Sequence, residues 1–238
     1  MIRGVLGKTP NENTYFGLFC RAVCFMKTLR KCNQSSDFQT IAHVNRALLE
    51  LTTDMILLHH DKADGYLKMR AWEESAKLKA AEKVLRYYGE QGLALPDHYH
   101  AQKAFIDKDK EAIVHKRQQF WAKVNHPVCR WTGNRLNTDV EIADSHENTK
   151  LTEIYCTEYQ KMNWMTHGSA LAGLRHMEPS GFMNLCGLSY AACGKLALLC
   201  AQMALKKFGF WKEGIYRGRW EDINRRIERH MASFLPAD

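Results

Sequence analysis

Apolar residues recur along most of the chain at spacings of three and four, which is the period of an amphipathic α-helix. No run alternates apolar and polar positions for long enough to predict a strand. Clusters of glycine, proline and asparagine interrupt the helical pattern, and no interior linker is long enough to separate two domains. The pattern therefore predicts an all-α, single-domain bundle of about seven or eight helices.

The expected helices cover residues 15–31, 37–60, 66–90, 101–123, a short segment near Val140, 149–174, 182–208 and 220–234. Residues 1–14 contain glycine, proline and asparagine and are expected to form an irregular leader. The bundle itself is expected over residues 15–208. Residues 209–238 then form a basic C-terminal extension whose helix packs on the bundle.

The second expected helix has an apolar face and a polar stripe. The apolar face consists of Ile41, Val44, Leu48, Leu51, Met55 and Leu58. The stripe, nearly opposite, consists of His43, Arg46, Glu50 and Asp54. One interpretation is a solvated face on which Arg46 and Glu50 form a weak ion pair. The other is a polar site inside the bundle, because Leu49, Ile56 and Leu57 flank the stripe.

A second group of candidate residues lies on the sixth expected helix. Tyr155 and Tyr159 are one turn apart, and His167 follows two turns later on a similar face. A single helical histidine is more often structural than catalytic. Here it is followed by Gly168 and Ser169, which leave room for a ligand or for another backbone.

Four short motifs occur in order along the chain: Arg46-x-x-x-Glu50, Arg130-Trp131-Thr132-Gly133, Tyr155-x-x-x-Tyr159 and His167-Gly168-Ser169. With the long apolar helix that follows them, they resemble a widespread bacterial all-helical family of unknown function, over about residues 15–208. The resemblance implies that Arg46, Glu50, Trp131 and His167 cluster in space. It also marks Arg130, Trp131, Tyr155 and Tyr159 as candidate binding residues, and it supplies no activity.

The C-terminal helix contains Arg225-x-x-x-x-His230, an arginine followed after a short gap by a histidine. This is similar to the signature of the HEPN superfamily of metal-independent ribonucleases. A motif of two residues also arises by chance, and Arg226 stands where that family usually has a polar residue such as asparagine. The HEPN-like interpretation therefore rests on an analogy of fold.

The net charge of +8 lies at the two ends of the chain. Residues 1–40 carry six Lys/Arg against two Asp/Glu, and residues 179–238 carry nine against five, whereas the middle is balanced. If the termini meet, they form one basic patch that attracts RNA or another polyanion. The alternative is a surface charge that only keeps the protein in solution.

Cysteine usage and hydropathy indicate a cytoplasmic protein that stays out of the membrane. The eight cysteines contain no C-x-x-C pair, so the sequence predicts neither a metal site nor a cofactor. Lys195 and Gln202 interrupt the most apolar stretch, which is typical of a buried core helix. His60-Asp61 matches a fragment of the HD phosphohydrolase motif, but it falls where the second helix is expected to end.

Two functional hypotheses follow. In the first, the protein is a metal-independent ribonuclease of defence or toxin type, in which His167 or His230 takes the proton from a ribose 2′-OH. Arg46 or Arg225 then stabilises the charge on the phosphate, and Glu50 holds Arg46 in place. In the second, the protein is a non-enzymatic helical module that binds a partner protein, a second copy of itself or a small ligand.

Overall fold

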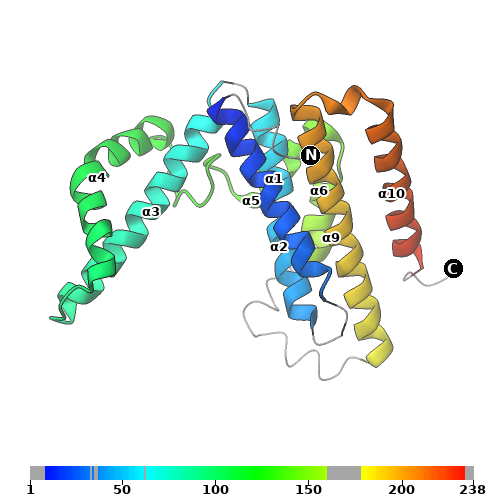
Figure 1. The fold of residues 1–238 in the computed structure, drawn as a ribbon, viewed down its shortest axis with the longest axis horizontal. Coiled ribbons are helices and arrows are strands. Elements are labelled where there is room, and N and C mark those ends of the chain that lie inside the picture. The colour runs from blue at the N-terminus through cyan, green and yellow to red at the C-terminus, as the bar shows by residue number, and fades with distance from the viewer. Residues whose placement is uncertain (1–8, 33, 35–36, 62, 160–177, 234–238) are drawn as a thin grey trace. The chain divides into compact units, whose positions relative to one another are not determined.

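The computed structural model describes residues 9–32, 34, 37–61, 63–159 and 178–233 (Figure 1). These residues form eight α-helices and no strand, so the predicted all-α class is confirmed. The contacts group them into two compact units, and each is described below by itself. The first unit comprises residues 1–61 and 137–238, and the second comprises residues 62–136.

The first unit is built on two long helices that lie side by side, α2 (Phe38–His60) and α9 (Pro179–Lys207). Helix α1 (Pro10–Leu29) packs on both of them, and α10 (Gly214–Ala232) packs on α9. Three further elements complete the unit: α5 (Leu136–Glu147), α6 (Leu151–Ile154) and the π-helical turn η3 (Tyr155–Tyr159).

Helix α2 is covered on nearly all sides. The predicted apolar face is buried throughout, and Leu48, Met55 and Leu58 are fully inaccessible. Leu49 and Ile56, which flank the polar stripe, are also fully buried. The residues of the polar stripe itself are less enclosed: His43 is exposed, and Arg46, Glu50 and Asp54 are half-buried, so the stripe lies between the two interpretations.

Helix α1 begins five residues earlier than the sequence pattern suggested, so residues 10–14 belong to a helix instead of the irregular leader. Thr9 accepts a hydrogen bond from the backbone N–H of Glu12 at 3.2 Å, and Glu12 accepts one from the backbone N–H of Thr9 at 3.0 Å. Pro10 occupies the first helical position, where its missing N–H costs nothing. This reciprocal capping box fixes the start of the helix.

Helix α9 carries three buried cysteines at intervals of seven residues, Cys186, Cys193 and Cys200. Burial raises the pKa of the Cys200 thiol to about 12, so this thiol stays protonated and behaves as a small apolar group. Ser180–Lys207 is long and apolar enough to cross a membrane, with half of the tested stretch buried in the structure. A central helix of a soluble protein meets the same criteria, so this observation is weak evidence for a membrane span.

The second unit is a helical hairpin of α3 (Gly65–Glu90) and α4 (His100–Trp121), joined through the 3₁₀ turn η2 (Asp97–Tyr99). Two ion pairs cross between the helices: Lys116 to Glu74 at 3.0 Å and Lys110 to Glu82 at 2.8 Å. An irregular segment that contains the Arg130–Gly133 motif follows α4.

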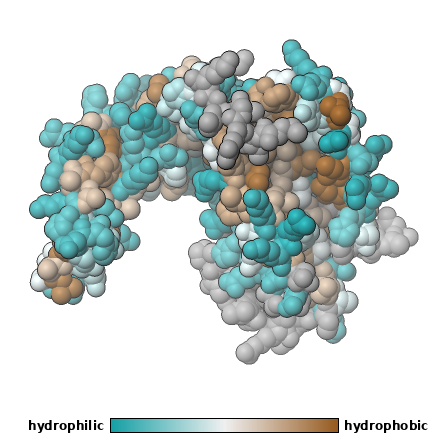
Figure 2. Space-filling model, in the orientation of Figure 1, coloured by the Kyte–Doolittle hydropathy of each residue, from teal (hydrophilic) through white to brown (hydrophobic). Residues whose placement is uncertain are grey.

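Most of the face shown in Figure 2 carries hydrophilic side chains. Apolar side chains gather there only in small patches. On α10, Ile215 and Ile223 are exposed. Single exposed apolar residues are normal on protein surfaces.

Candidate functional site

Arg46 and Glu50 lie one turn apart on α2 and form an ion pair, with 3.2 Å between Nε and Oε1. Their side chains are 33% and 38% exposed, so the pair is neither buried nor fully solvated. Neighbouring buried residues hold the helix in place, and the guanidinium remains reachable from solvent. The carboxylate of Glu50 fixes its orientation.

Tyr155 and Tyr159 stand beside this pair. Their rings stack with centroids 4.9 Å apart and an angle of 24° between the planes. The guanidinium carbon of Arg46 lies 5.2 Å from the centre of the Tyr159 ring, in cation–π geometry. These four residues, called the Arg46–tyrosine site below, come from α2 and η3, over 100 positions apart in sequence.

The π-helical geometry of η3 contributes to this arrangement. π-helical turns are rare and often occur at functional positions. In η3 the turn places Tyr155 and Tyr159 so that their rings stack, and both are half-buried. The sequence indicated that the two tyrosines share a face, and only the structure shows the wider turn.

A buried polar network connects the same elements to α9. The amide of Asn45 donates to the backbone carbonyl of Ser189 at 3.4 Å, and the Ser189 hydroxyl donates to Glu158 at 3.0 Å. All three residues are buried, and Asn45 is fully inaccessible. Sequence reasoning missed this network. The signal available was weak: Asn45 precedes Arg46, and Glu158 precedes Tyr159.

Two residues expected to join Arg46 and Glu50 are not placed with them. His167, with Gly168 and Ser169, lies outside the described residues. Trp131 belongs to the second unit, where it is buried, and Arg130 beside it is partly exposed. The expected cluster of all four residues therefore stays a prediction.

The Arg130–Gly133 motif forms a tight turn. The N–H of Gly133 donates to the carbonyl of Arg130 at 3.0 Å, and the N–H of Asn134 donates to the Thr132 hydroxyl at 3.2 Å. Gly133 has a φ of 84°, in the left-handed region that disfavours side chains. A Cβ at this position would stand 3.0 Å from the Trp121 ring. The glycine is therefore required by the turn.

Gly133→Ala should destabilise the second unit by about 1–3 kcal/mol, because it combines backbone strain with a steric clash. Gly92→Ala is the matched control, since Gly92 also has a positive φ (62°) but has open space around it. Urea unfolding followed by circular dichroism measures both variants. Equal losses of unfolding free energy in the two variants would show that the clash with Trp121 adds nothing to the backbone strain.

Arg225 and His230 lie on α10, and both side chains are exposed. Arg225 approaches Asp222 at 4.0 Å, and its side chain is 70% exposed. It lines an open hollow with Arg229, Asp222 and Glu228. Two carboxylates offset the two arginines there, so the hollow offers little attraction to a phosphate.

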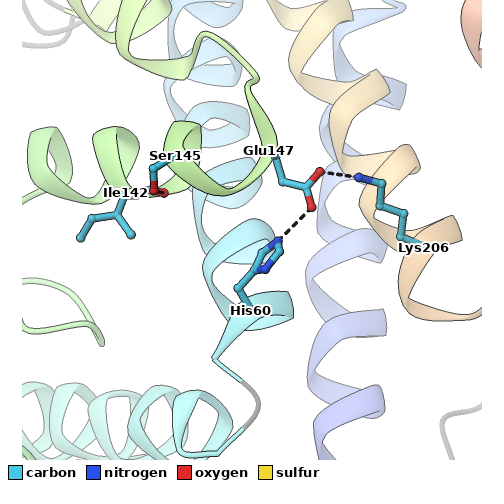
Figure 3. Close-up of polar contacts among 5 residues, drawn as sticks. All are labelled: His60, Ile142, Ser145, Glu147 and Lys206. Atoms are coloured by element: carbon cyan, nitrogen blue, oxygen red, sulfur yellow. Dashed lines mark hydrogen bonds and ion pairs between the residues drawn. The ribbon is translucent and has the colours of Figure 1, made fainter.

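A second polar cluster lies at the C-terminal end of α2 (Figure 3). The Nε2 atom of His60 lies 2.9 Å from Oε1 of Glu147, and Lys206 of α9 forms an ion pair with the other carboxylate oxygen. Burial raises the pKa of Glu147, but the hydrogen bonds from Lys206 and His60 outweigh it and hold that pKa below its usual value. Burial lowers the pKa of the adjacent His59. The sequence predicted no site here.

The fold and these clusters define an all-helical protein with polar residues enclosed by its central helices. The chain belongs to the family of unknown function DUF5677, whose model matches residues 15–183. This confirms the resemblance to a helical family without an assigned activity. The matched region includes the Arg46–tyrosine site and excludes α10, which carries Arg225 and His230. No curated protein and no solved structure matches the chain.

Proposed function

We propose that this protein acts on RNA as a metal-independent ribonuclease and that the Arg46–tyrosine site is where it holds its substrate. The observation that carries the proposal is the position of the Arg46 guanidinium. Glu50 holds it on one side, the Tyr159 ring lies on another, and one third of the side chain remains exposed.

The chemistry of the site suits a nucleotide chain. A guanidinium presents several N–H donors in a plane and binds phosphate oxygens well. Aromatic rings stack on nucleobases of any identity, and unpaired RNA bases are commonly held in this way. The half-buried Tyr155–Tyr159 pair lies beside Arg46, so one site combines both kinds of recognition.

In this mechanism Arg46 stabilises the negative charge that develops on the phosphate during attack by the ribose 2′-OH. Glu50 orients the guanidinium. A base must take the 2′-OH proton, and His167 is the residue we assign to this role. The 2′-oxygen bonds to phosphorus and displaces the 5′-oxygen of the next nucleotide, which takes a proton and leaves as a 5′-OH, so the products are a 2′,3′-cyclic phosphate and a 5′-hydroxyl end. His230 is the alternative base, and its exposed position on α10 makes it the weaker candidate.

The test is cleavage of single-stranded RNA by the purified protein in the presence of EDTA. Arg46→Ala should reduce the rate about 100-fold or more, the usual loss when one charge-stabilising donor is removed. Arg70→Ala is the matched control, because Arg70 pairs with Glu74 in the same geometry, at 3.0 Å and four residues apart. Intact RNA, or an equal loss in both variants, would exclude the proposal.

The second candidate is a non-enzymatic helical module that binds a partner protein or a small ligand. The buried network of Asn45, Ser189 and Glu158 favours it, because such networks also serve to hold helices together. Under this hypothesis Arg46 is structural. Arg46→Ala then lowers the melting temperature markedly, and every other readout falls only in proportion to the folded fraction.

A further inference from the structure

The cluster at the end of α2 brings together two imidazoles and a carboxylate. One nitrogen from each of His59 and His60 and one oxygen of Glu147 all lie within 4.8 Å of one another. His59 is half-buried, and its Nδ1 atom is shielded from solvent with no hydrogen-bond partner among the described residues. His146 stacks on His60 with ring centroids 4.4 Å apart and restricts its rotation.

We propose that His59, His60 and Glu147 bind a single divalent transition metal ion, for which Zn²⁺ is the best match. Zn²⁺ is commonly bound by imidazole nitrogens and a carboxylate oxygen at about 2.0–2.2 Å. Around a tetrahedral ion such ligands stand roughly 3.4 Å apart, so small side-chain rotations convert the observed cluster into a coordination site.

The contacts of Glu147 explain how the ion fits. Without the ion, Nε2 of His60 and Oε1 of Glu147 lie 2.9 Å apart and are joined by a hydrogen bond, which places one proton between them. The ion takes the place of this proton, which passes to solvent, as binding to imidazole requires. Lys206 stays on the second carboxylate oxygen (Figure 3) and orients the ligand, in the way that metal-binding carboxylates are usually hydrogen-bonded.

The bound ion connects the C-terminal ends of α2 and α5. His60 lies fourteen positions after Arg46, roughly 20 Å along the helix. The site is therefore separate from the Arg46–tyrosine site, and its role is to stabilise the fold. The positive charge of Lys206 opposes cations that have no affinity for imidazole, so Mg²⁺ and Ca²⁺ should not bind here.

Titration of the full chain with Zn²⁺ by calorimetry tests the proposal. Exposed thiols, such as those of Cys20, Cys24, Cys129 and Cys156, are first blocked with iodoacetamide, because thiolates also bind zinc. One ion should bind per chain and raise the melting temperature by several degrees. His59→Ala, His60→Ala and Glu147→Gln should each weaken binding about tenfold or more.

His43→Ala is the control, because His43 is an exposed histidine on the same helix. The Zn²⁺ affinity of His43→Ala should equal that of the unsubstituted protein. Co²⁺ provides a second readout that needs no variant: the visible bands of a four-coordinate ion should appear without a thiolate charge-transfer band. No binding, a thiolate band, or equal affinity in all variants would overturn the site. RNA cleavage in EDTA is a separate measurement, so either proposal can fail alone.

Discussion

Leu48→Ala should lower the free energy of unfolding by about 2–5 kcal/mol, the largest single-residue effect that we expect on stability. Leu48 is fully buried in α2, the helix that packs most extensively on α9. Truncation removes three carbon atoms from a site that rigid helices enclose, so the cavity closes only in part. The volume of the cavity that remains decides how much of the unfolding free energy is lost within this range.

Ile223→Ala is the control for this prediction, because Ile223 lies on α10 of the same unit and is 44% exposed. It should cost much less than Leu48→Ala, since nearly half of Ile223 already contacts water. Urea unfolding monitored by circular dichroism gives both values. Similar losses would contradict the assignment of α2 to the core.

Asp144→Ala should cost about 2 kcal/mol at neutral pH. Asp144 of α5 accepts hydrogen bonds from the Thr149 hydroxyl at 2.8 Å and from the backbone N–H groups of Leu151 and Thr152 at 2.7 and 2.8 Å. The last two bonds satisfy N–H groups at the start of α6, which have no partner within the helix. Their loss combines the removal of a cap with that of charge-assisted bonds.

The hydrogen bonds to Asp144 also predict how its contribution to stability depends on pH. Burial raises the pKa of Asp144, but the hydrogen bonds from Thr152, Leu151 and Thr149 outweigh it and hold that pKa below its usual value. A carboxyl group with a lowered folded-state pKa stabilises the fold above its unfolded pKa, near 3.9 for Asp. The stabilisation is lost as pH falls through the folded value. The difference between the original protein and Asp144→Ala should therefore be largest near pH 7 and shrink below about pH 4.

Denaturant midpoints between pH 3 and 7 measure this effect, with Glu141→Ala, an exposed carboxylate on the same helix, as the control. A difference that grows on acidification would mean that the charge of Asp144 does not stabilise α6. Since α6 leads directly into η3, the variant should also disturb the stacking of Tyr155 and Tyr159. RNA cleavage, if present, should then fall together with stability.

Much of the fold follows from short-range patterns. The period of apolar residues in α2 identified Ile41 through Leu58 as one buried face, and α3 begins and ends within one residue of its expected bounds. The Arg46–Glu50 pair is equally local, because residues four apart on a helix always lie on one face. The start of α1 was also encoded locally, in Thr9, Pro10 and Glu12, although the prediction placed that start too late.

What the sequence alone determined, therefore, is which residues form helices and which faces of those helices are apolar, because both depend on neighbours within about four positions. The tertiary structure decided the contacts that make the candidate sites. Asn45 meets Ser189 across 144 positions, and His60 meets Glu147 across 87. No periodicity connects residues so far apart, and only the packing of α2 against its neighbours brings their side chains within reach.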